Sequence, residues 1–403
     1  MKKSLLGQYF ALIAVFFVSL TLVFTIPNSW VSHHVDISRQ AFKLTGDYPN
    51  LNPADPGSRL DNFTDALMLR EAASGGDNPI KSAMNLDNYP RYWHGYLVWL
   101  RPLLSVMSYS AIRQLYALIL FSLIALTMYL MAKRFDLFVV LAFAVSLMFQ
   151  RLFSMFISLQ FSHVTFIMLG STITLLAMSN RRFEKLRVVS FFWIVGSLTN
   201  FVDLLTFPLV TLGVPLIVSL YRRSIAQQNM LGSTIIYAVK AVVSWFLGYA
   251  ITWLLTWILS SLVLGKNIIQ DAAYQILFRT EGSSSIPVTR LAMLKANLRT
   301  EFSSANLLVL ILVIVMFGIL LWRKMSRGLT LNTDWGFLAV VGILSLLPYL
   351  WYLVLANHSQ IHYWFTYREQ MITVFAWLMM LSRFARVATH KRASDVDFIS
   401  LRG

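Results

Sequence analysis

The sequence predicts an all-α integral membrane protein that forms one transmembrane domain over residues 1–403 and crosses the bilayer about ten times. Hydrophobic residues make up 57% of the chain, whereas charged residues make up only 13%. Apolar runs of roughly 18 or more residues recur along the chain, which is typical of transmembrane helices. Basic residues also concentrate in alternate short loops, as they do in polytopic membrane proteins.

The first apolar run follows Met1-Lys2-Lys3, and its charge resembles that of a signal peptide. It is too long for one, however, and lacks a small-x-small cleavage site before Pro27, so we expect a retained membrane anchor. The expected spans are residues 8–26, 113–132, 136–153, 161–179, 188–202, 205–220, 241–264, 306–322, 335–355 and 371–385.

Charge asymmetry orients these spans. With the N-terminus in the cytoplasm, 19 of the 34 basic residues and only five of the 18 acidic residues fall on the inner side. By the positive-inside rule we expect a multi-pass protein of the plasma membrane with both termini cytoplasmic. The net charge of +16 is therefore a topology signal, and no nucleic-acid partner is expected. The absence of cysteine excludes disulfides and thiolate metal sites.

The polar residues gather in three predicted extracytoplasmic loops. The first spans residues 27–112 and is long enough to carry interfacial helices. The second, residues 265–305, mixes Gly and Ser with Arg279 and other arginines, which favours a lid-like loop over a site. The third, residues 357–370, is rich in His and Arg. We therefore expect the function at the outer face of the membrane.

A short amphipathic segment in the first loop, residues 59–73, carries the candidate catalytic carboxylates. Asp61 and Asp65 are four residues apart, so on a helix they share one face. An apolar stripe on another side would hold this helix at the membrane surface. The alternative is an ordinary interfacial helix in which Asp61 stabilises the N-terminus through the helix dipole.

Aromatic and basic residues alternate in the segment that follows, residues 89–103. Arg91, His94 and Arg101 are candidates for binding a lipid phosphate or a sugar, because cations held among aromatic rings suit both. The alternative is an aromatic belt at the level of the lipid headgroups.

Four further residues are candidates for binding the substrate. His358 and His362 share one face if the third loop is helical, and Arg368 lies close by in the sequence. For the His pair, phosphate or sugar binding is favoured over a metal site, because no third ligand is adjacent. We therefore assign no metal ligand. Asp203 lies between two short apolar runs, where an ionisable group usually faces a cavity, although a simple outer turn closed by Pro208 is the alternative.

The segment Asp61-Asn62-Phe-Thr-Asp65-Ala66-Leu-Met-Leu-Arg70-Glu71, placed in a long loop after the first span, resembles the GT-C superfamily of polytopic glycosyltransferases. Members that use lipid phosphosugars often carry a pattern like Asp-Glu…Ala…Arg-Glu there. Asp61 matches the acidic position that serves as catalytic base. Asn62 departs from the usual second acid, and we expect Asp65 to assist from one turn away. The motif covers about a dozen residues, whereas the topology covers the chain.

The resemblance implies transfer of a sugar from a polyprenyl-phosphate carrier to an envelope glycopolymer or lipid on the outer face. The chemistry is consistent, since a carboxylate would accept the proton of the attacking hydroxyl and Arg or His would stabilise the departing phosphate. A flippase or transporter of lipid-linked saccharides and a membrane-embedded polysaccharide polymerase are the alternatives. The sequence leaves open the sugar, the acceptor, any divalent-metal cofactor and the stereochemistry.

Overall fold

The computed structural model describes residues 5–226, 231–326 and 334–384. This part of the chain is helical almost throughout, and its only sheet is the two-stranded hairpin β1 (Gly282–Ser283) and β2 (Ile286–Pro287). The prediction of an all-α fold is therefore confirmed. Both ends of the chain, residues 1–4 and 385–403, for which we expect a cytoplasmic location, lie outside the described residues.

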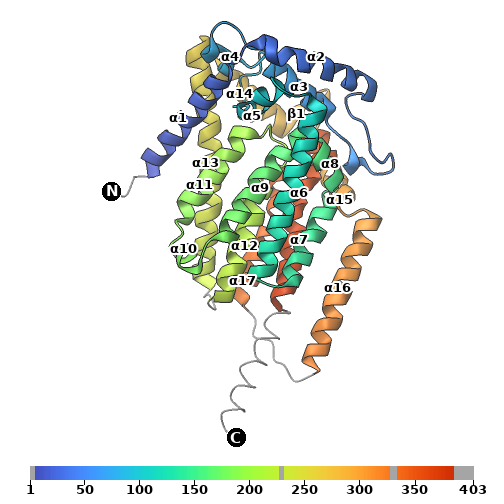
Figure 1. Ribbon diagram of the computed structural model, residues 1–403. Coiled ribbons are helices and arrows are strands. Elements are labelled where there is room, and N and C mark those ends of the chain that lie inside the picture. The colour runs from blue at the N-terminus through green and yellow to red at the C-terminus, as the bar shows by residue number, and fades with distance from the viewer. Residues whose placement is uncertain (1–4, 227–230, 327–333, 385–403) are drawn as a thin grey trace.

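Long apolar helices form a bundle in which most axes run in a similar direction (Figure 1). The helices of the bundle and its flanks are α1 (Leu5–Val23), α6 (Tyr109–Arg134), α7 (Leu137–Phe149), α9 (Leu159–Ala177), α11 (Val188–Val202), α12 (Val210–Ala226), α13 (Leu231–Leu264), α16 (Ser304–Met325), α17 (Trp335–Leu344), α18 (Leu347–Val354) and a last helix that includes residues 371–384. Helix α9 is mostly buried in the bundle, whereas α16 stands beside the bundle and is mostly exposed (Figure 1).

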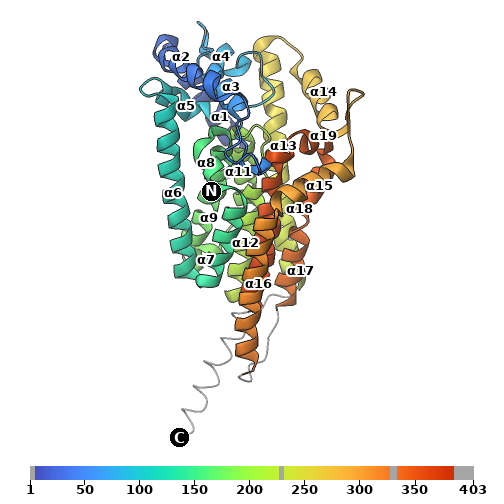
Figure 2. The ribbon, with the colours of Figure 1, turned by 90° about the vertical axis from the view of Figure 1, so that its right-hand side faces the viewer.

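Shorter elements supply a helical layer, and many of them gather at one end of the bundle (Figures 1 and 2). They are α2 (Asn28–Thr45), η1 (Pro56–Ser58), α3 (Asn62–Ala72), α4 (Pro79–Asn85), α5 (Leu97–Leu104), α8 (Leu152–Ile157), α14 (Ile268–Glu281), α15 (Arg290–Glu301), α19 (Ala356–Ile361), α20 (Tyr363–Thr366) and η2 (Tyr367–Gln370). All except α8 come from the three segments expected as outer loops. The second of these segments is thus largely helical rather than an open loop. Helix α10 (Asn180–Glu184) lies at the opposite end.

The expected number of about ten spans is wrong for the described residues. Five helical segments are long and apolar enough to cross a membrane: 109–134, 159–177, 231–264, 304–323 and 335–354. The count becomes six if α1 and α2, which meet at a bend of 82°, are taken as one broken span. These helices are compatible with a multi-pass membrane protein.

The discrepancy arises because apolar runs and continuous helices differ in length. The run at 136–153 forms only the 13-residue α7, which ends before Gln150, and Arg151 then adopts a left-handed backbone with φ of 51°. Helices α11 and α12 have 15 and 17 residues. A helix needs about 20 residues to cross the hydrocarbon core, so these shorter helices fill the bundle without meeting that length.

The close packing of α11 against α13 depends on two glycines. A Cβ atom on Gly196 of α11 would overlap the carbonyl oxygen of Trp245, and one on Gly248 of α13 would overlap that of Trp193. Small residues at such positions allow two backbones to approach closely, as is usual in membrane helix pairs. Gly248 is followed in α13 by Tyr249, Trp253 and Trp257, which line a cavity described below.

Candidate functional site

Asp61 is the N-cap of α3. Its Oδ1 accepts a hydrogen bond from the backbone N–H of Thr64 at 2.9 Å, and its Oδ2 accepts one from the Thr64 hydroxyl at 2.8 Å. The interpretation of Asp61 as the residue that begins this helix is confirmed. Burial raises the pKa of Asp61 to about 6, an effect that the two bonds from Thr64 oppose and the nearby Asp65 increases. A carboxyl group with this pKa can take up a proton near neutral pH.

Asp65 has a different environment, although it lies only one turn further along α3. Its carboxylate accepts hydrogen bonds from Tyr109 Oη at 2.6 Å and from the backbone N–H groups of Leu159 and Gln160 at 3.0 and 3.1 Å. Burial raises its pKa, and these hydrogen bonds oppose the rise. The two amides are at the N-terminus of α9, where a negative charge is stabilising. Asp65 therefore ties α3 to the central helix of the bundle.

Aromatic residues and one arginine surround the start of α3, and we call Tyr48, Arg59, Phe63 and Trp364 the Asp61 rim. The Tyr48 ring stacks on Phe63 with centroids 6.1 Å apart and meets Trp364 edge-on at 5.7 Å. The Arg59 guanidinium lies 5.6 Å from the centroid of Trp364. Tyr48 and Phe63 are each almost half exposed, so their rings are available to a ligand. Exposed aromatic rings beside a carboxylate offer both stacking and hydrogen bonding to a sugar.

A second cluster joins the C-terminal segment to α14. The Arg279 guanidinium donates from Nη1 to His358 Nδ1 and to His362 Nε2, both at 3.3 Å. Nε2 of His358 is therefore the protonated nitrogen, and it donates to the Leu205 carbonyl at 2.8 Å. We call Arg279, His358 and His362 the Arg279 cluster.

The charge of the Arg279 cluster resides on the arginine alone. Burial lowers the pKa of His362 to about 3, and the positive charge of Arg279 lowers it further. Burial also lowers the pKa of His358 well below its usual value. Both imidazoles are therefore neutral at physiological pH. Among the described residues Arg279 forms no ion pair with a carboxylate, so its charge is available to an anionic ligand.

Next to this cluster is a cavity of about 220 Å³, whose lining includes both Arg91 and Arg279. We call it the aromatic cavity, because six aromatic residues line it: Tyr92, Phe246, Tyr249, Trp253, Trp257 and Trp351. The Arg91 carbonyl accepts hydrogen bonds from the indole N–H groups of Trp253 and Trp257 at 2.8 and 3.0 Å. The Arg91 Nη1 atom is 2.7 Å from Asp271 Oδ2. An apolar cavity with two arginines in its wall matches an anionic amphiphile.

The C-terminal segment links the aromatic cavity to the Asp61 rim. The ring of His362 stacks on Phe365 with centroids 4.9 Å apart, and Phe365 meets Trp364 edge-on at 4.8 Å. Trp364 belongs to the Asp61 rim, and His362 belongs to the Arg279 cluster. The structure therefore brings His358 and His362 together with Arg279, and joins them through aromatic contacts to the neighbourhood of Asp61.

Two candidate residues of the first loop are used inside the protein. Arg101 is fully buried, and its guanidinium donates to the carbonyl oxygens of Val23 at 2.9 Å, Ile26 at 2.7 Å and Ala72. These bonds join the end of α1 to the end of α3. His94 Nδ1 lies 2.8 Å from the buried carboxylate of Glu71. Neither side chain is directed to the aromatic cavity by these contacts.

Arg368 and Asp203 also have internal partners. Arg368 is fully buried and donates to the carbonyl oxygens of Gln150 at 3.3 Å and Gly57 at 3.1 Å. Asp203 accepts hydrogen bonds from the backbone N–H of Thr206 at 3.0 and 3.2 Å and so closes a tight turn after α11. Burial raises the pKa of Asp203 to about 6, and the bonds from Thr206 oppose this. Asp203 therefore lies in a turn, as the alternative interpretation expected, and its role in binding substrate stays a prediction.

A set of half-buried and buried charged residues lies between the layer and the bundle, and sequence reasoning did not pair its members. Arg151 binds both carboxylate oxygens of Asp55 at 2.9 and 3.2 Å. Glu301 is fully buried and accepts a hydrogen bond from the side chain of Gln150 at 3.2 Å. Burial raises the pKa of Glu301 well above its usual value. Arg151 and Asp55 are 96 positions apart, and Gln150 and Glu301 are 151 positions apart, so no local sequence pattern could have paired them.

The described residues contain no group of three or more His, Asp or Glu side chains arranged to hold a metal ion. The position shared by His358 and His362 is taken by the Arg279 guanidinium, which donates to both rings. A cation of the protein itself thus binds this His pair, in place of the metal ion considered from sequence.

Comparison of the chain with models of protein families, with curated proteins and with solved structures finds no match. The function must therefore be argued from the residues of the site. Those residues are a buried carboxyl with a raised pKa, an aromatic rim beside it, and an aromatic cavity with two arginines.

Proposed function

We propose that the protein is a membrane glycosyltransferase that uses a polyprenyl-phosphate sugar as donor. The observation that carries this proposal is the placement of Arg91 and Arg279 in the wall of the aromatic cavity. Arg279 suits the phosphate of such a donor, Arg91 is held in the wall by its ion pair with Asp271, and the aromatic wall suits the first isoprene units of the lipid. The resemblance of residues 61–71 to the GT-C motif supports the proposal from the sequence.

In this proposal Asp61 is the general base. An acceptor hydroxyl attacks the anomeric carbon and gives its proton to the Asp61 carboxylate, while the bond between that carbon and the phosphate oxygen breaks. The lipid phosphate leaves with both bonding electrons, and Arg279 stabilises its increased charge. The rings of the Asp61 rim would hold the acceptor, an envelope glycan or glycolipid. Asp65 contributes by holding α3 against α9 rather than by contacting substrate.

The proposal places the helical layer at the extracytoplasmic face and the chain termini in the cytoplasm, as the charge asymmetry predicts. Single cysteines test this directly, since the native chain has none. In intact cells a membrane-impermeant thiol reagent should label Asp77→Cys, and it should label Lys185→Cys only after permeabilisation. Both residues are exposed, and they lie in the layer and beside α10 respectively. The reverse labelling pattern would contradict the orientation and the outer location of the site.

The activity test uses the purified full-length protein, polyprenyl-phosphate sugars and a candidate glycan acceptor. We expect release of free polyprenyl phosphate that requires the acceptor and depends on Asp61. Movement of the lipid-linked sugar across vesicles without release of polyprenyl phosphate would instead identify a flippase. Release that accompanies growth of a long glycan chain would identify a polysaccharide polymerase.

A further inference from the structure

A second cavity lies at the end of the bundle opposite the helical layer. Its position follows from α9, whose N-terminal amides bind Asp65 and whose C-terminal carbonyls face this cavity. Helix α9 has 19 residues and is therefore about 28 Å long, close to the thickness of the hydrocarbon core. The cavity, of about 480 Å³, is thus at the other membrane interface from the candidate site.

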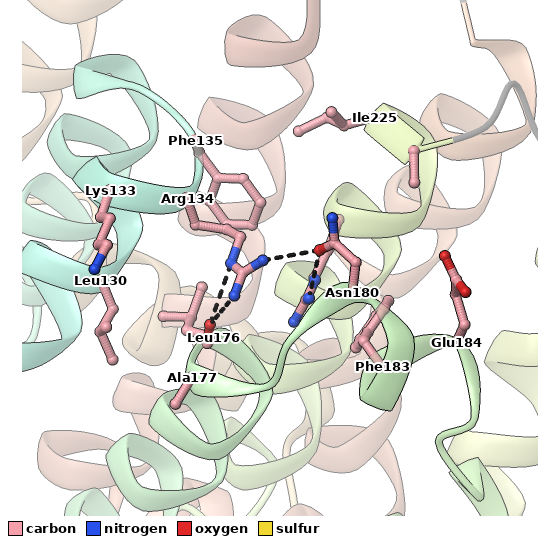
Figure 3. Close-up of a pocket in the computed structure, with 12 residues that line it drawn as sticks. Leu130, Lys133, Arg134, Phe135, Leu176, Ala177, Asn180, Phe183, Glu184 and Ile225 are labelled. Atoms are coloured by element: carbon pink, nitrogen blue, oxygen red, sulfur yellow. Dashed lines mark hydrogen bonds between the residues drawn. The ribbon is translucent and has the colours of Figure 1, made fainter.

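Two arginines border the cavity and bind the C-terminal end of α9. Arg134 donates to the carbonyl oxygen of Leu176 at 2.9 Å and to Asn180 Oδ1 at 2.9 Å (Figure 3). It also donates to the carbonyl oxygen of Met178 at 2.7 Å. Arg222 donates to the same oxygens of Met178 and Asn180, at 2.8 and 2.9 Å, and to the carbonyl of Leu175. Arg222 thus uses three of its five N–H groups within the protein.

The positive charge at this cavity exceeds the negative charge around it. Lys133 adds a third cation, and Glu184 is the one carboxylate in the lining; Figure 3 shows the two on opposite sides of the cavity. In the described part of the chain, neither arginine forms an ion pair with a carboxylate. The C-terminus of α9 contributes only about half a negative charge. An excess of about one and a half positive charges therefore remains for a ligand.

The rest of the lining is apolar and includes Leu130, Leu176, Phe183 and Ile225. A cavity that combines cations with an apolar wall, at a membrane interface, fits a headgroup whose acyl chains continue into the bilayer. We propose that this cavity binds the phosphate of an anionic phospholipid. This binding is independent of glycosyl transfer and would fix the ends of α6, α9 and α12 at the interface.

Native mass spectrometry of the purified full-length protein in detergent tests the proposal with phosphatidylglycerol, phosphatidylcholine and inorganic phosphate as probes. We expect phosphatidylglycerol to bind more tightly than phosphatidylcholine. Lys133→Ala should weaken phosphatidylglycerol binding about fivefold, because that is the contribution of one basic residue near an anionic lipid headgroup. Lys133 is exposed and lies at the end of α6, so its loss should leave the fold intact.

Lys185→Ala is the matched control, because Lys185 is an exposed lysine next to α10 that does not line the cavity. It should leave phosphatidylglycerol binding unchanged. Equal weakening by both variants would overturn the proposal in favour of diffuse attraction to the basic surface, as would equal binding of the two phospholipids. Displacement of phosphatidylglycerol by inorganic phosphate at comparable affinity would also overturn it, since the cavity would then be a site for a soluble anion.

Discussion

Two regions of the helical layer use their charged side chains in different ways. The first, which we call the inner region of the layer, contains Arg101 and Asp65. Their side chains form hydrogen bonds with backbone carbonyl and amide groups of neighbouring helices. The second, which we call the outer region of the layer, contains Asp61 and Arg279. Burial raises the pKa of Asp61 to about 6, and Arg279 has no carboxylate partner among the described residues. All four are half-buried or buried polar residues of the same layer.

This difference separates residues that hold the fold from residues that cost it stability. A buried charge with matched hydrogen-bond partners stabilises the arrangement of the elements it joins. A buried carboxyl whose pKa is raised is destabilising when ionised, and such residues are concentrated at functional sites. Burial raises the pKa of Asp65 as well, so the two aspartates are separated by their partners. Asp61 is bonded only by Thr64 of its own helix, and Arg279 has no carboxylate partner among the described residues, which makes these two the better candidates for chemistry. Asp65 and Arg101 join neighbouring helices and are structural residues.

The largest expected effect is on turnover. Asp61→Asn should lower kcat by about 10²–10⁴-fold, the usual cost of losing a general base. The amide oxygen can still accept the bond from the Thr64 N–H, and Asn is as good an N-cap as Asp, so the helix should form normally. Donor affinity should be unchanged. Normal turnover in this variant would remove Asp61 from the mechanism and leave it only the role of a cap.

The same variant should change stability in a pH-dependent way. Because folding raises the pKa of Asp61 from 3.8 to about 6, the folded state binds this proton more tightly than the unfolded state. Ionisation therefore costs stability, by an amount that is absent below pH 4, grows as pH rises and reaches about 2–3 kcal/mol above pH 6. Asp61→Asn should have a higher Tm than the wild type at pH 7 and an equal Tm at pH 4. A lower Tm at both pH values would show that the carboxylate is stabilising.

Hydropathy located most of the helices but misjudged how many span the membrane. Apolar runs near 109–134, 159–177 and 304–323 became long helices. The run at 136–153 did not, because its polar residues Gln150 and Arg151 end α7 and begin a separate short helix. Hydropathy is averaged over a window of residues, so a break of two polar residues within an apolar run does not show in it. The end of the helix is set by the backbone hydrogen bonds.

The candidate site was predictable only where its residues are close in sequence. His358 and His362 could be paired because positions i and i+4 share a helix face, and the structure does bring them together. Their common partner Arg279 is about 80 residues away, so no spacing rule could join it to them. The helical spacing of Asp61 and Asp65 does not separate them, and in the sequence Asp61 is preferred for its position near the start of the helix and for the resemblance of the motif. They differ because Leu159, 94 positions beyond Asp65, presents its amide to one carboxylate and not to the other.

A stability measurement on Asp65→Asn tests the inner region. The substitution replaces one of the two oxygens that accept bonds from Tyr109 and from two amides of α9 with an NH₂ group, and a buried donor left without its acceptor costs about 1–3 kcal/mol. We expect a lower Tm at pH 7, with residual folded protein that still turns over. Loss of turnover with an unchanged Tm would instead make Asp65 the base and shift the motif by one helical turn.

The smallest effect concerns the donor. Arg279→Gln should lower kcat/KM for a polyprenyl-phosphate sugar about tenfold, with a higher KM and a lower kcat, because the lost charge-assisted bond to the phosphate strengthens as the phosphate leaves. Arg290→Gln is the matched control, since Arg290 is an exposed arginine of the same segment that does not line the aromatic cavity. It should leave the kinetics unchanged.

The kinetics and Tm of Arg279→Gln and its control Arg290→Gln decide whether Arg279 belongs with the functional residues of the outer region or with structural residues such as Arg101. Arg279 differs from Arg101 in having two neutral imidazoles, rather than several carbonyl oxygens, as its partners. If Arg279→Gln lowers Tm and leaves KM unchanged, Arg279 is one more structural arginine, and the two imidazoles are its hydrogen-bond acceptors. If KM rises while Tm is kept, the imidazoles serve to orient a guanidinium whose charge is left for the phosphate. In that case the neutral state of His358 and His362 is itself functional, because a protonated imidazole would repel the arginine it positions.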